Sequence, residues 1–324
     1  MLKLMDLKEQ GKKNTLLLPK EKQVGMINII LINFLLFITF ISCTKEQPSN
    51  TEIPQNSKMS QSVNTQINAF TERPFYQIKI KTSGVNYDIL INDFSVFSFY
   101  GKSGGTNSEY PINTGILASG KQSLTVKVYP IKGADKILPN NSFTLVINKK
   151  KDAWIFDNQR EVILTMPTMV VPESGLPYWE YKAEFDAVVP YNLQGWKNSS
   201  KLEDENNLQS RLMTAYNNLK TAIETKNNEE FIKLTKNKVD QEAISLYEKQ
   251  EENANGFQAE KETVLPFDHC TMKFYGNGKL VRLEAEDGQP CLRSELIIDG
   301  KKEIYYYPVF FHLPKDRNEL EVIR

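Results

Sequence analysis

The chain has 324 residues, and its 40 lysine and arginine side chains are balanced by 40 aspartate and glutamate side chains. Apolar residues make up 40% and charged residues 25%, which excludes a polytopic membrane protein and a disulfide-dense miniprotein. The zero net charge argues against a basic nucleic-acid binder, so we expect no nucleic-acid partner. The length suffices for about two domains of roughly 150 residues each.

The N-terminal region contains one uncharged apolar run, from Met26 to Ile41. At about 16 residues it is shorter than the roughly 20 that a transmembrane helix needs. The run ends at Ser42 and Cys43 and is followed by an abruptly polar stretch, which is typical of a cleavable export signal. We therefore expect residues 1–42 to be a signal peptide, with translation starting at Met1 or at Met26.

The residues Ile41-Ser42-Cys43 resemble a bacterial lipobox, with Phe40 where that motif usually has a leucine-like residue. The resemblance implies that the bond before Cys43 is cleaved and that fatty-acyl chains such as palmitate are attached to this cysteine. The alternative is a plain N-terminal anchor helix with an incidental cysteine. Two or more acyl chains suffice for stable membrane anchoring.

The residues Thr44-Lys45-Glu46 resemble the surface-export signal of Bacteroidota-type lipoproteins. This implies a lipoprotein of the cell envelope, anchored to the bacterial outer membrane on its periplasmic face or on the cell surface. Serine, threonine, asparagine, glutamine and proline dominate residues 43–69, which therefore predict a flexible tether behind the lipidated cysteine. A short amphipathic element is the alternative.

Residues 70–190 predict an antiparallel β-sandwich, because short runs that alternate apolar and polar side chains are separated by turn residues. The expected strands are 76–81, 87–91, 123–129, 143–147 and 161–165. The order of the segments 91–93, 111–113 and 117–128 resembles the jelly-roll or galactose-binding-like sandwich of envelope proteins. This resemblance implies an architecture and no particular activity.

We expect a polar linker over 191–205 and an α+β domain over 206–324, with helices followed by an antiparallel meander. Apolar residues at helical spacing predict a helix over 208–223, capped by Asn206 or Asn207, and two short helices around 231–234 and 243–247. The expected strands are 271–275, 280–285, 291–298 and 303–311, with hairpin turns at 276–278 and 299–300. This order of elements resembles an NTF2-like or cystatin-like cone.

Catalytic and metal-binding patterns are sparse. His269 and His312 are expected at the surface or at a strand rim, and neither has the spacing of a zinc ligand. The segment 101–105, with three glycines around a serine, fits a hairpin loop better than a nucleophile elbow. We therefore expect no catalytic residue, cofactor or metal. Glu284, Glu286 and His312 are the side chains that an enzyme of NTF2-like type would use.

Two further groups of residues are candidates for binding or stability. The aromatic clusters of 178–181 and 305–307 offer Trp179, Tyr181 and Tyr306 as rings that bind a sugar or a protein, and the alternative places them in the core. Cys270 and Cys291 can form a disulfide in an exported protein. A simple meander would separate them by about 9–10 Å, beyond the limit of about 7 Å for a disulfide, so two free thiols remain the alternative.

Together these features predict a lipid-anchored cell-envelope protein with a non-enzymatic binding or structural role, whose partner is a protein or a glycan. The first alternative is a carbohydrate-binding or substrate-capture lipoprotein that uses the aromatic side chains of the sandwich. The second is an NTF2-like enzyme with an acid or a histidine inside the cone.

Overall fold

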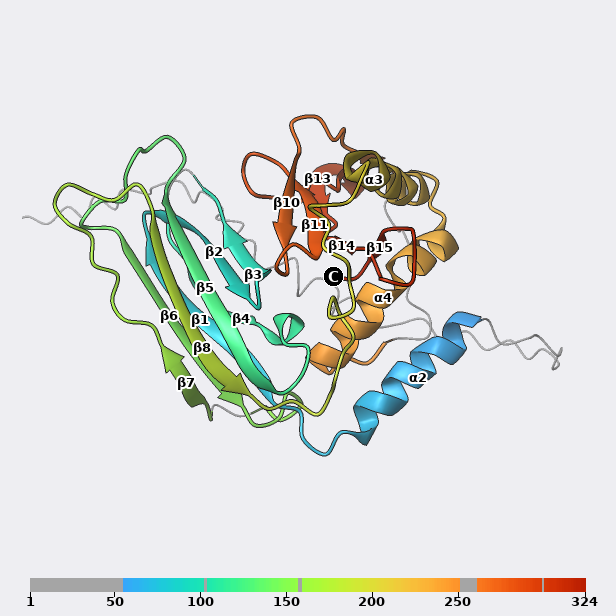
Figure 1. Cartoon of the computed structure of the whole chain (residues 1–324), viewed down its shortest axis with the longest axis horizontal. Helices are drawn as coiled ribbons and strands as arrows, with labels where there is room; N and C mark the ends of the chain where they lie inside the picture. The colour runs from blue at the N-terminus through green and yellow to red at the C-terminus, as the bar shows by residue number, and fades with distance from the viewer. Residues whose placement is uncertain (1–54, 102–103, 157–158, 251–260, 299) are drawn as a thin grey trace, which may run out of the picture. The chain divides into compact units, whose positions relative to one another are not determined.

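The computed structural model describes residues 55–101, 104–156, 159–250, 261–298 and 300–324. In these residues most of the regular structure is antiparallel strand, arranged in four sheets and accompanied by three α-helices (Figure 1). The expected signal peptide and Cys43 lie outside the described residues. Among those that are described, no helix is long and apolar enough to cross a membrane.

Two four-stranded sheets occupy the N-terminal part. The first sheet has the strand order β4-β1-β6-β7, with β4 (Asn107–Pro111), β1 (Phe75–Ser83), β6 (Ser142–Lys150) and β7 (Glu161–Thr165). The second sheet has the order β3-β2-β5-β8, with β3 (Phe94–Phe99), β2 (Val85–Ile91), β5 (Gly120–Pro130) and β8 (Trp179–Ala187). Alternate residues of β1 and β5 are buried, and Tyr87 of β2 contacts Phe143 of β6 across the core. This confirms a sandwich-like arrangement of antiparallel sheets.

Strands β3 and β4, on either side of the segment 101–105, do not form a hairpin. Strand β3 pairs with β2, whereas β4 pairs with β1. The chain therefore passes here from one sheet to the other, and the hairpin prediction is wrong. Neither β3 nor β4 was visible as a strand in the sequence, because neither alternates cleanly between buried and exposed residues.

The predicted tether is partly helical. Helix α2 (Gln55–Ala69) covers its second half and buries Val63 and Ile67, which are one helical turn apart. The Asn64 side chain donates to the Gln250 carbonyl and accepts from the Gln250 backbone N–H, both at 2.7 Å. The tether prediction is therefore wrong for 55–69, because two apolar side chains and one amide suffice to hold this polar segment on the folded protein.

The predicted polar linker over 191–205 is packed as well. Tyr191, Leu193, Trp196 and Leu202 are buried, although polar residues separate them in the sequence. The Leu193 N–H donates to the Leu117 carbonyl at 2.7 Å, and the Leu202 N–H donates to the Gly278 carbonyl at 2.8 Å. This segment is thus tied to residues that precede it and to residues that follow it in the sequence, and it is not an exposed connector.

Two longer helices follow. Helix α3 (Leu208–Glu224) matches the predicted one, and Asn207 occupies its N-cap position without a side-chain capping bond. The two predicted short helices are one continuous helix, α4 (Asn228–Leu246). The Asn227 side chain caps α4 by accepting from the Glu230 N–H at 3.1 Å.

The C-terminal strands form two sheets rather than one meander. One sheet has the strand order β10-β11-β14-β15, with β10 (Thr271–Tyr275), β11 (Leu280–Glu284), β14 (Phe311–His312) and β15 (Glu321–Val322). The other has the order β13-β12-β9, with β13 (Lys301–Tyr306), β12 (Arg293–Ile298) and β9 (Lys261–Val264). Pairing of β10 with β11 and of β12 with β13 confirms both predicted hairpins. The single curved meander is wrong, because β11 pairs with β14.

The core is continuous across residues 191–205. One cluster of buried side chains contains the sandwich interior together with Ile244 and Tyr247 of α4, Leu280 of β11, and Phe310 and Ile323. A second cluster lies between α3 and the β10-β11-β14-β15 sheet. In the described chain each sheet draws its strands from only one side of 191–205, but the packing does not divide there.

Candidate functional site

A pocket of about 280 Å³ is formed by β3, α4, β11 and Arg324. Its apolar lining comes from Phe94, Val96, Phe97, Pro290, Pro308 and Phe310, and its polar lining from Ser95, Ser98, Thr114, Lys238, Glu242, Arg282 and Arg324. A concave site whose apolar walls surround convergent polar groups can bind a small molecule, and in this pocket the polar groups are at least as many as the apolar ones.

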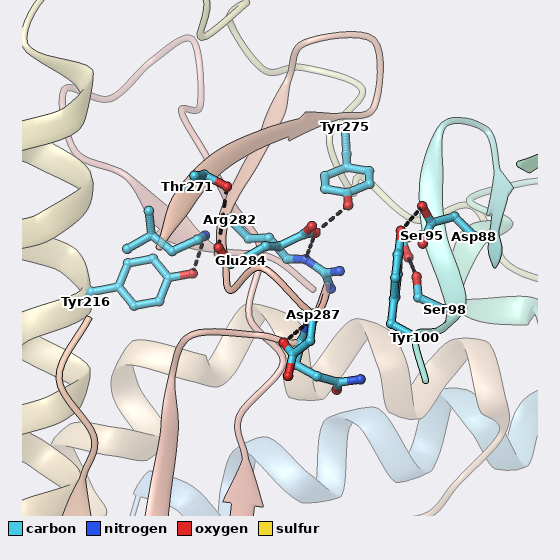
Figure 2. A network of polar contacts seen from close by, with 12 residues as sticks. Asp88, Ser95, Ser98, Tyr100, Tyr216, Thr271, Tyr275, Arg282, Glu284 and Asp287 are labelled. Atoms are coloured by element: carbon cyan, nitrogen blue, oxygen red, sulfur yellow. Dashed lines mark hydrogen bonds and ion pairs between the residues drawn. The ribbon is translucent and has the colours of Figure 1, made fainter. Parts of the chain in front are cut away.

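Strand β11 brings a buried ion pair to this pocket. Because alternate residues of a strand share a face, Arg282 and Glu284 lie side by side, and the Arg282 Nε donates to Glu284 Oε1 at 2.5 Å (Figure 2). The Tyr275 hydroxyl donates to the same carboxylate oxygen. Burial disfavours the arginine cation, but Tyr275 and Glu284 outweigh this effect and raise the pKa of Arg282.

The outer edge of the Arg282 guanidinium is free to bind a ligand. Its two terminal nitrogens point away from Glu284, toward the side on which Ser95 and Ser98 lie (Figure 2). In the described part of the chain, only its Nε has a protein hydrogen-bond acceptor. The hydroxyls of Ser95 and Ser98 are 3.1 Å apart and line the same pocket.

Arg324 supplies a second guanidinium, which is 1% exposed. Its Nε donates to the Thr114 carbonyl at 3.1 Å and its Nη1 to the Ile323 carbonyl at 3.2 Å, whereas its Nη2 has no partner among the described residues. Burial lowers the pKa of Arg324 to about 10, so that the group is still protonated at neutral pH.

The charges in the pocket do not cancel. Glu284 neutralises Arg282, and Glu242 neutralises Lys238, whose Nζ is 2.6 Å from Glu242 Oε1. No side-chain carboxylate in the described chain forms an ion pair with Arg324. Counted over side chains alone, the pocket has one excess positive charge, and the Glu242 charge also acts on Arg324, where it opposes the lowering of the pKa by burial.

The turn after β11 is held against the sandwich. A Cβ atom on Gly288 would lie 2.4 Å from Tyr100 Cε2, so only glycine fits here. The Tyr100 hydroxyl donates to Asp88 Oδ2 at 2.5 Å, and burial together with the Asp88 charge raises the pKa of Tyr100. This contact fixes one wall of the pocket, since Gly288 and Pro290 both line it.

A second polar cluster contains a serine, a histidine and an acid. The Ser199 hydroxyl lies 2.7 Å from His312 Nδ1, and His312 Nε2 lies 3.9 Å from Glu321 Oε2. Ser199 is only 1% exposed, and Arg317 also pairs with Glu321. A substrate cannot reach this hydroxyl, so we interpret the cluster as a buried structural pair.

The structure also corrects the expected position of His312. This residue is buried and not on a surface or strand rim. Burial, with a smaller contribution from the Arg317 charge, lowers its pKa to about 4. His269 is exposed as expected and has a left-handed backbone with φ of 60°.

The predicted binding aromatics do not converge. Trp179 and Tyr181 lie on β8, stack at 12° with centroids 6.2 Å apart, and pack half-buried against the sandwich core. Tyr306 is half-buried at the end of β13, in a different sheet. Of the acids expected for a cone enzyme, Glu284 is ion-paired and Glu286 is exposed.

Cys270 and Cys291 form a disulfide, with their Cα atoms 6.3 Å apart. Thr271 lies opposite Glu284, one residue away from the register that the simple meander gives, in which Cys270 faces Glu284. The chain then turns tightly, and the Cys291 N–H donates to the Leu283 carbonyl at 3.0 Å, which keeps Cys291 beside β11. The expected separation of about 9–10 Å is therefore wrong, because it assumed one further strand spacing.

A scan against protein-family models found no match, and searches of curated proteins and of solved structures found no similar chain. Function is therefore inferred from the residues of the pocket. Sequence reasoning identified Glu284 but missed Arg282 and Arg324. The Arg-x-Glu spacing within a predicted strand was the available signal for Arg282, because it places opposite charges on one face. No local pattern marks Arg324.

Proposed function

We propose that this protein is a lipid-anchored, non-enzymatic binding protein of the bacterial cell envelope, attached to the outer membrane through Cys43. Its pocket binds a small organic carboxylate with an apolar body. The single observation that carries the binding role is the buried guanidinium of Arg324, whose Nη2 has no acceptor in the described chain, in the same pocket as the free edge of Arg282. A buried guanidinium N–H without an acceptor gains a charge-assisted hydrogen bond when an anionic ligand binds.

The chemistry of the pocket suits this ligand class. The terminal nitrogens of a guanidinium form a fork that matches a carboxylate in two parallel hydrogen bonds, and the Arg282 fork has no protein acceptor in the described chain. The Phe94 and Phe310 rings would cover an apolar body. The pocket is slightly smaller than the roughly 300–1,000 Å³ of drug-sized sites, which favours a small acid.

Calorimetric titration with benzoate tests the proposal on the wild-type chain and on an Arg324→Met variant. Wild type is expected to bind one benzoate saturably, and the variant to bind it at least about tenfold more weakly, since a lost charge-assisted contact has about this effect. The same variant is expected to be as stable as wild type or more stable, because an apolar side chain of similar length replaces a buried charge.

Arg317→Gln is the matched control, because it removes an arginine that is mostly exposed and lies outside the pocket. It is expected to bind benzoate like wild type. Equal affinity of wild type and Arg324→Met for benzoate would contradict the proposed site. An Arg324→Met variant that is less stable than wild type would contradict the expected effect on stability, and its affinity is therefore measured below its unfolding temperature.

The other two functions have weaker support. A glycan site would need exposed, aligned rings, and Trp179 and Tyr181 are aligned but packed on the core. An enzyme would need a reactive acid or base, and Glu284 is already bound by Arg282 and Tyr275. We also propose that the chain has two domains, a β-sandwich followed by an α+β domain, which share one core. Each described sheet takes its strands from only one of these two domains.

A further inference from the structure

The segment between β6 and β7 presents three consecutive apolar side chains to solvent. Trp154 is 44% exposed, Ile155 54% and Phe156 102%. Val162, at the start of β7, adds a fourth side chain that is 61% exposed. Single exposed apolar residues are ordinary, but a contiguous group that includes a fully exposed phenylalanine indicates an apolar binding partner.

The base of this segment is held firmly. The Trp154 Nε1 donates to the Tyr247 carbonyl at 2.8 Å, and the Arg73 guanidinium lies 3.5 Å from the centroid of the Trp154 ring. The Ala153 N–H donates to the Arg73 carbonyl at 2.8 Å. Ile155 and Phe156 are therefore presented from a fixed platform.

Lysines precede the apolar tip in the sequence and lie beside its base, where Asp152 is paired with Arg73. Lys149, Lys150 and Lys151 precede it in the sequence, and Lys249 lies 4.9 Å from the centroid of the Trp154 ring. Glu161 pairs with Lys149, and Glu72 lies 3.8 Å from Lys151. Lys150 and Lys249 have no acidic partner in the described chain.

An apolar tip with the unpaired lysines Lys150 and Lys249 near its base is complementary to the surface of an anionic membrane. Aromatic and aliphatic side chains enter the boundary between headgroups and acyl chains, and lysine ammonium groups stay beside the phosphates. The net charge of the whole chain gives no such attraction, so it must come from this local group of lysines.

The tip lies within reach of the expected anchor. Arg73, which supports Trp154, follows the end of α2 by four residues. Fifteen helical residues span about 22 Å, and the twelve residues from Cys43 to the start of α2 extend to about 40 Å at most. Acyl chains on Cys43 and the tip at Phe156 can therefore enter one membrane together.

We propose that Ile155 and Phe156, presented by the fixed Trp154, insert into the anionic surface of the membrane that holds the protein. The insertion gives the folded part a defined orientation on the bilayer. It rests on the proposed anchorage at Cys43 and is independent of the anion pocket.

Two full-length reporter variants test the insertion. Phe156→Trp adds a fluorophore at the tip, and Val170→Trp adds one at a control position that is 76% exposed. Val170 lies beyond the end of β7 that is farther from the tip. Each variant is bound to phosphatidylcholine vesicles that contain phosphatidylglycerol and acyl-chain-brominated lipid. Wild-type emission is subtracted from each signal.

The added emission of Phe156→Trp is expected to shift to the blue and to lose more than about half its intensity to the brominated acyl chains, as for a ring at the membrane interface. The added emission of Val170→Trp is expected to stay unquenched by the lipid. Omitting phosphatidylglycerol should weaken the Phe156→Trp effect, because the lysines then lose their anionic partners.

The proposal is overturned if both reporters are quenched equally, or if aqueous iodide quenches Phe156→Trp as strongly with vesicles as without them. Unfolding midpoints verify that both variants fold, since both sites are exposed. Fatty-acid labelling of Cys43 is measured separately in cells. If Cys43 is labelled with fatty acid but the Phe156→Trp emission is not quenched by the brominated lipid, the insertion alone is overturned. If Cys43 is not labelled, the anchorage is overturned. In both cases the quenching result decides whether the tip inserts.

Discussion

Gly288 allows the pocket wall to pack against Tyr100 of the sandwich, because it has no side chain. Its φ is +70°, and an added Cβ would meet the Tyr100 ring at 2.4–3.0 Å. The ring cannot move aside freely, because its hydroxyl is bound to Asp88. Two costs therefore act at this position, the left-handed backbone and the steric overlap.

Gly288→Ala is expected to lower the free energy of unfolding by about 3 kcal/mol, as the sum of backbone strain and overpacking. Gly300→Ala is the control, because Gly300 has a φ of +71° but no atom within 4 Å of its Cβ position. It should lose only about 1 kcal/mol. Urea denaturation measures both, and equal losses would show that the contact with Tyr100 does not matter.

His312 makes stability depend on pH. Its folded pKa of about 4 lies below the ordinary value of 6.5, so the unfolded chain binds a proton first as pH falls. The folded state therefore loses stability as pH falls from about 6.5 toward 4 and gains nothing further above pH 7. Arg317 and Glu321 are the charged groups that face the ring.

Between pH 7 and pH 5, protonation of His312 in the unfolded chain is expected to lower the free energy of unfolding by about 2 kcal/mol. His312→Gln should remove this part of the pH dependence, whereas His269→Gln should retain it because His269 is exposed. Urea denaturation at the two pH values measures the difference. A His312→Gln variant with the wild-type pH profile would contradict the assignment.

Among the elements, the β10–β11 hairpin depends on its covalent link to the turn that follows. The Cys270–Cys291 disulfide closes a loop of 21 residues. Such a loop contributes about 3 kcal/mol in the chain-entropy model, because the bond restricts the unfolded chain. The same bond holds Cys291 near the base of the turn that carries Gly288 and Pro290.

The double variant Cys270→Ser/Cys291→Ala is expected to be less stable than the oxidised protein by about 2–4 kcal/mol. Mass spectrometry of the alkylated, unreduced wild type should find neither cysteine modified. Alkylation of both cysteines would exclude the bond. The single variant Cys270→Ser and the reduced wild type both lack the disulfide but keep the Cys291 side chain. Comparing their stability with that of the double variant separates loss of the bond from loss of Cys291 packing.

For the whole molecule, the expected anchorage depends on one residue. Cys43→Ala should abolish incorporation of an alkyne fatty acid and should release the protein from the washed membrane fraction, because acyl chains supply the membrane affinity. Ser42 is retained in this variant, so that the small residue before the cleavage site is unchanged. Continued labelling of Cys43→Ala would show that the lipobox assignment is wrong.

The sequence by itself determined the features that depend on neighbouring residues. Strict alternation located β1, β5 and β6, helical spacing located α3, and glycine-containing turns located the β10–β11 and β12–β13 hairpins. These patterns are readable because side-chain direction repeats every two residues in a strand and every 3.6 in a helix.

Only the tertiary structure decided which distant segments meet. Helix α2 is held by Gln250, β11 pairs with β14, and the buried site of His312 is completed by Ser199. Arg282 and Arg324 are 42 residues apart, yet they line one pocket. Burial of a charge depends on everything packed around it, and no short stretch of sequence contains that information.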